Sequence, residues 1–510
     1  MEISVDMRRR EFLERMAAST LLANEGFAST GLRFRGVTDG QDPVATRTER
    51  QLFLDDFWFE RRDGVHLTRH SPVLREPAIS LDRPWERKWL SYSTVIQEGD
   101  RYRMWYRVTE GQEAQSWTCY AESHDGIHWD KPSLGIVARE GSRDNNIVFD
   151  PSLGLNASVL RDPNGLADER YKLLVRRAGN LEGLVSPDGL RWRPVSHNPL
   201  LDSTRGYYDS HNVLLWDEER GVYVIYMRGF VDESGRLRTA PEWEEVDKQR
   251  VRTWRIIRRS ESPDFRRWSE PQLVVQRDAD DPDTLHFYTN AAAKYGRAAH
   301  AYFMFPMVLH VTNRGSEETG RQFPGTPSPG LSDIHFLTSR DGIRWERRFR
   351  NALISPGPDL RNWVDRNPIM GPGMIQTGAA EISMYYSELF HARESRLRRC
   401  TFRTDGFVSV EGPYAVWGEF TTRPLTFEGG RLEINYSTSG GGTILVELLD
   451  DSGKPITGHT LAECQPVFGD QIEGIVRWKQ GEDVRRLSNR PVRLRVRLRD
   501  AHLYAFRFPA

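Results

Sequence analysis

The chain has 510 residues, of which 28% are charged and 38% hydrophobic, and its formal net charge is −1. A charge this close to zero provides no basic surface for a phosphate backbone, and no apolar run approaches the roughly 20 residues of a membrane-spanning helix, so we expect neither a nucleic acid partner nor a membrane span. Three cysteines, Cys119, Cys400 and Cys464, are an odd number without CxxC spacing, which excludes a disulfide framework.

The first predicted element is an export signal at residues 1–28. Residues 8–13 read Arg-Arg-Arg-Glu-Phe-Leu and precede a short apolar stretch at 16–23, a pattern typical of twin-arginine signals. Glu14 lies beside this stretch and no clear A-x-A cleavage site follows, so a plain cytosolic amphipathic start is the alternative. We therefore expect a periplasmic or secreted protein, with a cytoplasmic one as the second reading.

A short turn sequence recurs along the middle of the chain. Ser-x-Asp-Gly-x-x-Trp occurs at 123–129, 186–192 and 339–345, 262–268 has Phe in place of Gly, and 404–407 is a worn copy. The aspartates are 63 to 77 residues apart, a spacing typical of one four-stranded propeller blade with variable loops. Asp-Gly followed by Trp favours a hairpin turn, because Gly accepts positive φ and Asp binds its own backbone.

Each copy goes with a predicted hairpin that would supply the two inner strands of a blade. The paired strands are expected at 92–96 and 102–106, 156–160 and 171–175, 211–215 and 223–227, 288–292 and 300–305, and 373–376 and 381–386. Five such units predict a five-bladed β-propeller over 45–418. A long β-sandwich with repeated hairpins is the alternative.

The character of the chain changes near residue 419. Largely alternating strands joined by Gly- and Asp-rich turns are expected at 425–427, 432–436, 443–448, 475–478 and 492–498. This pattern predicts a separate β-sandwich at 419–510. The predicted fold class is therefore all-β, a five-bladed β-propeller followed by a C-terminal β-sandwich.

This arrangement resembles the invertase, levanase and arabinanase group of glycoside hydrolases. Phrases similar to those of exported, invertase-like bacterial proteins lie at 52–56, 83–86, 144–146, 209–212, 286–290 and 503–508. The resemblance implies a carbohydrate pocket in the central funnel, on the face opposite the Asp-Gly turns, where the long insertions 229–249 and 307–332 also lie.

Two features depart from that group. The Asn-Asp-Pro-Asn-Gly nucleophile motif is absent, and a Glu-Cys pair occurs only in the predicted sandwich, at 463–464. Arg161-Asp162-Pro163 matches an invertase triplet, but the blade alignment places Asp162 beside Glu98 and Asp217 in the turn between two strands. We therefore interpret Asp162 as a hairpin residue.

Glycoside hydrolysis needs two carboxyl groups that flank the bond. Asp209 opens the third inner strand and is expected to act as base or nucleophile, Glu388 ends the second strand of the fifth unit and is expected to act as general acid, and Glu86 is the third carboxylate. Asp283 and Asp365 stand at comparable entries to the fourth and fifth units. The alternative roles are a turn cap for Asp209, a rim salt bridge for Glu388 and a surface loop residue for Glu86.

Neutral side chains near the same strand ends would bind sugar hydroxyl groups. These candidates are Asn156, His211, Asn212, Tyr288, Asn290 and Asn367, with Trp85, Tyr207 and Trp363 as stacking surfaces. Their alternatives are hydrogen bonds to backbone groups, a packed core histidine and packing between blades.

The predicted function is a glycoside hydrolase that acts on an oligo- or polysaccharide, without a cofactor or a catalytic metal. A non-catalytic carbohydrate-binding or scaffold propeller is the main alternative. A sialidase-like enzyme is a further one, although sialidase turns have an extra residue between Asp and Gly. The acidic run 278–283 offers oxygen ligands for a structural Ca²⁺ but lacks a known loop spacing, so we interpret it as a solvated linker.

Overall fold

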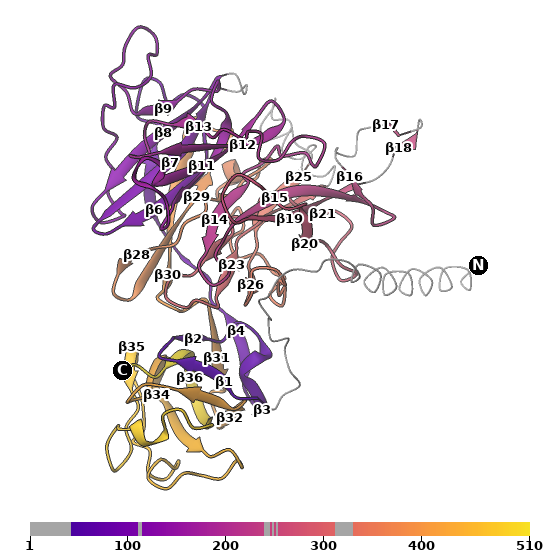
Figure 1. Ribbon diagram of the computed structural model, residues 1–510. Coiled ribbons are helices and arrows are strands. Elements are labelled where there is room, and N and C mark those ends of the chain that lie inside the picture. The colour runs from indigo at the N-terminus through magenta and orange to yellow at the C-terminus, as the bar shows by residue number, and fades with distance from the viewer. Residues whose placement is uncertain (1–41, 111–114, 239–244, 247–248, 251–252, 312–329) are drawn as a thin grey trace, which may run out of the picture. The chain divides into compact units, whose positions relative to one another are not determined.

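The computed structural model describes residues 42–110, 115–238, 245–246, 249–250, 253–311 and 330–510 (Figure 1). Pro43–Ala510 forms one compact unit, and the predicted export signal lies outside the described residues. Strands dominate the described part, so the expected all-β class is confirmed. Its helices are single 3-10 turns: η1 (Asp56–Trp58), η3 (Ala167–Glu169), η4 (Leu360–Asn362) and η5 (Arg485–Leu487). Within these residues, no helix has the length and apolar character needed to cross a membrane.

Antiparallel sheets built from consecutive segments make up most of residues 89–403. The first sheet is β6 (Trp89–Glu98), β7 (Arg101–Thr109), β8 (Ser116–Ser123) and β9 (Ile147–Phe149). The second sheet is β10 (Leu155–Arg161), β11 (Tyr171–Arg177), β12 (Asn180–Ser186) and β13 (Arg193–Pro194). The third sheet is β14 (Val213–Asp217), β15 (Val222–Asp232), β19 (Thr253–Ser262) and β20 (Gln272–Val275), with β16 (Leu237–Arg238) beside β15. Strands β17 (Glu245–Val246) and β18 (Gln249–Arg250) pair with each other.

The fourth and fifth sheets have interrupted inner strands. The fourth is split into β21 (Leu285–Phe287), β24 (Met307–Val311) and β25 (Gly330–Ile334), and into β22 (Ala293–Lys294), β23 (Tyr302–Met304) and β26 (Leu337–Ser339). The fifth is β27 (Ile369–Met370), β29 (Glu381–Glu388), β30 (Arg396–Arg403) and β5 (Val73–Ser80), with β28 (Ile375–Gly378) beside β29. A strand that precedes the first sheet in sequence thus completes the fifth.

Proline and glycine explain these interruptions. Pro306 has no N–H to donate and separates β23 from β24, so the expected strand at 300–305 ends at Met304. The expected strand at 288–292 is instead the irregular segment between β21 and β22. In the fifth sheet, the expected strand at 373–376 gives way to β27 and β28. A Cβ on Gly373 would lie 2.3 Å from the backbone oxygen of Val95 in β6. Glycine therefore allows the fifth sheet to approach the first closely.

Neighbouring sheets contact one another in chain order, and the fifth contacts the first. Strand β10 contacts β6 and β14, β19 contacts β21, β25 contacts β27, and β29 contacts β6. Buried apolar side chains fill these boundaries. For example, Met104 of the first sheet and Leu397 of the fifth belong to one core cluster. These contacts are consistent with the predicted propeller, while its five-blade closure stays a prediction.

The Asp-Gly turns share one hydrogen-bond pattern, as the repeat predicts. In the copy at 186–192, the Gly189 N–H donates to Ser186 Oγ at 2.9 Å, and Asp188 Oδ1 accepts from the N–H groups of Leu190 and Arg191, both at 2.8 Å. The aspartates at 125, 264 and 341 accept the equivalent backbone bonds. Each of these turns therefore satisfies its own backbone donors.

The turns are also anchored on the preceding sheet. The Trp105 indole donates to the backbone oxygen of Gly189 at 2.9 Å, and the Tyr226 hydroxyl donates to that of Gly342 at 2.5 Å. Gly342 has φ 67°, a conformation that favours glycine. The repeat thus holds neighbouring sheets together as well as forming hairpins.

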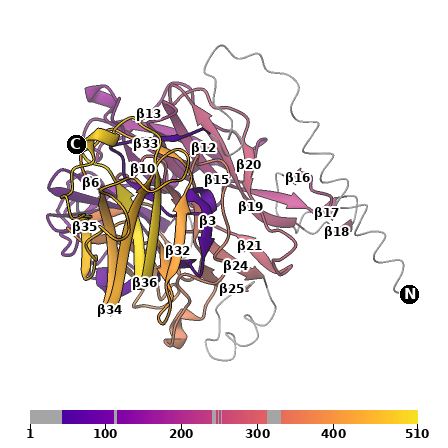
Figure 2. The same ribbon diagram turned by 90° about the horizontal axis from the view of Figure 1, so that it is seen from below.

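The C-terminal residues form an eight-stranded sheet that also contains N-terminal strands (Figures 1 and 2). Its order is β3 (Phe59–Asp63), β32 (Gly418–Thr422), β36 (Arg493–Arg507), β31 (Val408–Gly412) and β4 (His66–Arg69). Strands β2 (Gln51–Leu52), β34 (Glu433–Leu449) and β35 (Asp470–Ile475) complete it, and β1 (Val44–Arg47) pairs in parallel with β33 (Leu425–Phe427).

These pairings change the expected division at residue 418. Residues 51–69 and 408–412, assigned by sequence to the propeller, hydrogen-bond to the C-terminal strands. Phe53 packs against Phe506 at 5.8 Å between ring centres, so the N-terminal segment also contributes to the core of this sheet. The expected strands at 432–436 and 443–448 are one strand, β34, because residues 439–442 form a bulge that does not end the ladder. A sandwich over 419–510 stays a prediction.

Candidate functional site

Side chains from all five sheets meet near the start of the inner strands. The Asn156 amide donates to the backbone oxygen of Ser210 at 3.0 Å, and the Ser210 hydroxyl donates to that of Tyr288 at 2.9 Å. The ring centre of Tyr92 is 5.2 Å from that of His211. We use the name central cluster for the ionisable groups of this region: Tyr92, Arg107, Asp209, Arg228, Arg255, Tyr288, Asp365 and Arg366.

The backbone around the central cluster is irregular. Tyr92, Asn156 and Arg366 have φ of 49°, 59° and 55°. The β6–β7 ladder shifts register between residues 91 and 94, and the β10–β11 ladder shifts between 155 and 158. Left-handed backbone is uncommon for residues other than glycine and is concentrated at functional sites. Bulges re-aim side chains, so local distortions set the directions of Tyr92 and Asn156.

Asp209 is the half-buried carboxylate of the cluster. Across the described ranges, its carboxylate makes no hydrogen bond and no ion pair. Burial, Tyr288 and Asp209 raise the pKa of Tyr92, whereas Arg228 and Arg107 lower it. Asp209 thus lies near the Tyr92 phenol, and its carboxylate oxygens, which have no partner in the described ranges, can bind a ligand or a proton.

Three arginines lie over the rings of the two tyrosines, Tyr92 and Tyr288. The guanidinium carbons of Arg228 and Arg255 lie 3.9 Å and 5.4 Å from the ring centre of Tyr288. That of Arg107 lies 5.9 Å from the ring centre of Tyr92. These distances are in the range of cation–π contacts.

Asp365 has the properties of a proton donor. Only 2% of the residue is exposed, Oδ2 accepts from Arg366 Nε at 2.7 Å, and Oδ1 has no partner in the part of the chain that the structure describes. Burial raises the pKa of Asp365, and the charges of Arg366 and Arg255 lower it less. Since burial disfavours the charged form, this carboxyl group retains its proton to a higher pH than an exposed one.

The four predicted sugar-binding asparagines bind backbone groups instead. All are buried, and each donates its amide to a backbone oxygen at 2.8–3.1 Å: Asn156 to Ser210, Asn212 to Tyr208, Asn290 to Tyr226 and Asn367 to Asn362. They donate to backbone oxygens that irregular strand ends leave without a partner in a sheet. Such bonds to the backbone were the alternative to sugar binding in the sequence analysis.

His211 is a packed core histidine. Its Nε2 lies 2.9 Å from the backbone oxygen of Ala157, and burial lowers the pKa of His211 to about 4. The imidazole is therefore neutral at neutral pH and bound to the backbone. Among the predicted binding residues, Tyr288 belongs to the central cluster.

Glu86 and Trp85 belong to a separate, satisfied network. The Glu86 carboxylate accepts from the Tyr106 hydroxyl at 2.6 Å and pairs with Lys131 Nζ at 2.6 Å, and its side chain is 0% exposed. Burial raises the pKa of Glu86, while Lys131 and Tyr106 lower it. The Trp85 indole donates to Asn146 Oδ1 at 2.7 Å. The Glu86 carboxylate is therefore occupied by Lys131 and Tyr106, and the partly buried Trp85 ring packs against the core of the first sheet.

Glu388 is held by two arginines. Its Oε1 is 2.5 Å from Arg396 Nε and 2.8 Å from Arg398 Nε, and its side chain is 6% exposed. Two guanidinium groups on one carboxylate suit a fixed anion and not a proton donor. Asp283 is exposed and pairs with Arg277 at 3.0 Å. Glu388 and Asp283 are therefore better explained as salt-bridge residues than as catalytic residues.

The two remaining stacking candidates lie in different surroundings. The Tyr207 ring contacts that of Phe230 at 6.0 Å between centres, as in ordinary aromatic packing. Trp363 is 40% exposed and its indole donates to the backbone oxygen of Gly357 at 2.8 Å. Its ring is thus the more exposed of the two.

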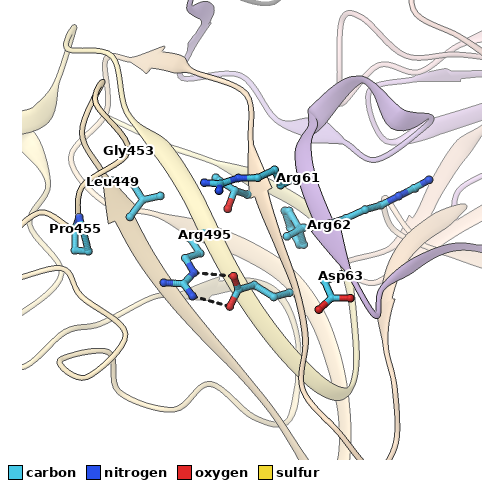
Figure 3. Close-up of a pocket in the computed structure, with 10 residues that line it drawn as sticks. Arg61, Arg62, Asp63, Leu449, Gly453, Pro455 and Arg495 are labelled. Atoms are coloured by element: carbon cyan, nitrogen blue, oxygen red, sulfur yellow. Dashed lines mark hydrogen bonds and ion pairs between the residues drawn. The ribbon is translucent and has the colours of Figure 1, made fainter.

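One cavity of about 560 Å³ lies on the C-terminal sheet (Figure 3). Arg495 binds Glu419 there through two bonds of 2.8 Å and 2.9 Å. Arg61, Asp63 and Pro455 also line it, and no predicted site residue does. Its two carboxyl groups belong to Asp63 and Glu419, and Arg495 holds both oxygens of Glu419, so this cavity does not offer two available carboxylates.

A second cavity, of about 600 Å³, lies beside the central cluster; we call it the basic cavity. It is lined by Leu81, Glu86, Arg87, Lys88, Trp89, His391, Ala392 and Arg393. The His391 ring centre is 4.6 Å from that of Trp89. Burial and the nearby Arg366 lower the pKa of His391 to about 4, which ties this cavity to the cluster.

Among the described residues, one group outside the cluster has side chains that could hold a metal ion. The ligand atoms of His310, Asp333 and His335 lie within 4.8 Å of one another, with His310 Nε2 and Asp333 Oδ2 3.4 Å apart. Two imidazoles and a carboxylate suit Zn²⁺ or a related ion. In the acidic run 278–283, by contrast, Asp278 and Asp281 pair with Arg347 and Arg350, so arginines neutralise these carboxylates.

The sequence interpretation missed Tyr92, Arg228 and Arg366 as site residues. Tyr92 opens the first predicted inner strand, the position that yielded candidates in the other units. Arg107 and Arg228 follow aromatic-rich second strands at corresponding places, after Tyr106 and Met227. Aligning the repeats for charged residues would have selected both arginines.

No family model matches the chain. Over 141 residues it is 31% identical to the uncharacterized proteins MT1551 and Rv1502 of Mycobacterium tuberculosis, strains CDC 1551 / Oshkosh and ATCC 25618 / H37Rv. The match covers 26% of this chain and spans 43% of the length of each relative.

Several solved structures have similar chain traces. A glycoside hydrolase has a TM-score of 0.44 at 15% identity, covering 68% of this chain and 94% of that one. The α-L-arabinofuranosidase PaAbf62A from Podospora anserina, in complex with cellotriose, has 0.41 at 11% identity, covering 65% and 96%. A thermostable family-43 glycoside hydrolase has 0.40 at 14% identity, covering 68% and 96%.

Proposed function

We propose that the chain is a glycoside hydrolase that acts on an oligo- or polysaccharide at the central cluster. The observation that carries this proposal is the half-buried Asp209 carboxylate, which has no partner in the described ranges and lies among strand starts from all five sheets. The ordered contacts from the first sheet to the fifth and back support a five-bladed propeller. A β-sandwich at its C-terminal end is part of the proposal. Export to the periplasm or outside rests on residues 8–13 alone.

Asp209 and Asp365 have complementary properties for this reaction. Asp365, buried and with a raised pKa, gives its proton to the glycosidic oxygen as the bond from the anomeric carbon breaks. Asp209, as carboxylate, either takes a proton from the attacking water or bonds to the anomeric carbon itself. Asp365 thus replaces Glu388 as acid, because Glu388 is held by Arg396 and Arg398.

A hydrolysis screen of the purified protein on plant, algal and bacterial glycans tests this proposal. We expect sugar release that Asp209→Asn reduces by at least about 10²-fold, because a base or nucleophile is lost. Glu388→Gln is the matched control, with activity expected within a few-fold of wild type. Full activity in Asp209→Asn would contradict the assignment. Retardation on glycan gels without sugar release would favour a carbohydrate-binding protein.

A further inference from the structure

The central cluster contains more cationic than anionic groups. Its arginines are Arg107, Arg228, Arg255 and Arg366, and its carboxyl groups are Asp209 and Asp365. Arg366 pairs with Asp365 at 2.7 Å, which leaves Asp209 as the one further carboxylate of the cluster. The named groups of the cluster therefore include more cations than anions.

Arg228 is a buried cation of the cluster without an anionic partner among the described residues. It is 3% exposed, its Nε donates to the backbone oxygen of Tyr288 at 3.3 Å, and its Nη2 is buried without a hydrogen-bond partner among the described residues. No described carboxylate lies within ion-pair distance of it. A buried cation is costly unless it is paired, and a guanidinium fork matches a carboxylate or a sulfate.

The basic cavity adds a second, independent indication. Lys88 and Arg393 are exposed in its lining, and neither forms an ion pair within the described ranges. Its one acidic lining residue, Glu86, is fully buried and paired with Lys131. The ligand-facing charges of this cavity are therefore positive, next to the ring of Trp89, on which a sugar could stack.

We propose that the substrate is an acidic glycan, in which a sugar carboxylate or sulfate group binds Arg228 and further anionic residues lie over the basic cavity. This inference rests on the proposed function, because it names the substrate class of the same site. Asp209 and Asp365 act on the glycosidic bond, while Arg228 selects the sugar beside it.

Calorimetric binding to matched glycans tests the proposal. The probes are uronate oligosaccharides (galacturonate, glucuronate and mannuronate), the same oligosaccharides as methyl esters, and sulfated galactans with their desulfated forms. We expect at least one acidic form to bind about tenfold or more tightly than its neutral partner. The uronate and galactan arms distinguish a carboxylate from a sulfate. Equal affinity for charged and neutral forms would overturn the inference and leave the proposed function intact, whereas no binding to any glycan would overturn both.

Substitutions test which residues produce the preference for acidic over neutral glycans. Arg228→Gln is expected to reduce the tenfold preference to about onefold, and Arg228→Lys, which retains the charge, to keep part of it. Arg83→Gln, at an exposed arginine outside both sites, is the control and should keep the full preference. Should Arg228→Gln not fold, the double variant Lys88→Gln and Arg393→Gln tests the basic cavity instead. Its affinity for longer acidic oligosaccharides is expected to fall several-fold. An unchanged preference in the folded variants would overturn the assignment.

Discussion

The Asp-Gly turns and the central cluster lie at different parts of the same sheets and have opposite properties. In the turn at 186–192, Asp188 accepts backbone bonds from Leu190 and Arg191, and glycine takes the positive φ. In the cluster, Tyr92 and Arg366 take positive φ, as does Asn156 beside it. Polar atoms of Arg228 and Asp365 are buried without partners in the described part.

This difference indicates that the turns contribute to stability and the cluster to ligand binding. The turns follow the local preferences of their residues, so they stabilise the hairpins and the boundaries between sheets. The cluster goes against those preferences, which is typical of sites whose polar groups are meant for a ligand.

The largest effect is expected where a turn glycine meets a neighbouring sheet. A Cβ at Gly342 would lie 2.8 Å from the Tyr226 hydroxyl oxygen and 3.2 Å from the Tyr302 ring, so Gly342→Ala should lower the free energy of unfolding by about 3 kcal/mol. Gly221 has nearly the same φ, 65° against 67°, but nothing within 4 Å. Gly221→Ala should therefore cost only about 1 kcal/mol in urea denaturation. Equal losses would mean that the contact between sheets is unimportant.

A carboxylate with partners should behave as part of the scaffold. Glu388→Gln leaves Arg396 and Arg398 without their anion, so we expect a loss of about 2 kcal/mol of unfolding free energy. Glycan hydrolysis should stay within a few-fold of wild type at a temperature where the variant is folded. A stable but inactive Glu388→Gln variant would return Glu388 to the site.

The buried Asp365 should make stability depend on pH. Because burial raises its pKa in the folded protein, its contribution is fully present below the unfolded pKa of about 4 and is lost as pH rises through the folded value. The Asp365→Asn side chain cannot ionise, so the unfolding free energy of this variant should rise relative to that of wild type as the pH increases from 4 to 8. Denaturation at a series of pH values measures this, and a difference constant with pH would refute the raised pKa.

Sequence was informative where the physics is local. The Ser-x-Asp-Gly turns predicted their own hydrogen bonds and the hairpins around them, and Asp162 was correctly placed in a turn, where its N–H bonds to Arg170. Pairing of 51–69 with the C-terminal strands joins segments hundreds of residues apart, for which periodicity gives no signal.

The site was harder to predict because charge balance is not local. Two of the three predicted catalytic carboxylates are bound by cations. Glu86 pairs with Lys131, which is 45 residues away in the sequence, and Glu388 pairs with Arg396 and Arg398. Asp209 was selected because we expected it to open an inner strand, and it lies four residues before β14 begins at Val213. No pattern in the sequence indicated that its carboxylate lacks a partner in the described residues.

The central claim is that the turns stabilise the protein while the cluster is reserved for a ligand, and paired urea denaturation of Asp188→Ala and Asp209→Ala tests it most directly. Asp188→Ala should lose about 1–2 kcal/mol of unfolding free energy, because two backbone N–H groups and the Ser186 hydroxyl lose their acceptor. Asp209→Ala should stay within about 0.5 kcal/mol of wild type. A loss at Asp209 as large as that at Asp188 would contradict the account, since Asp209 would then be a structural residue.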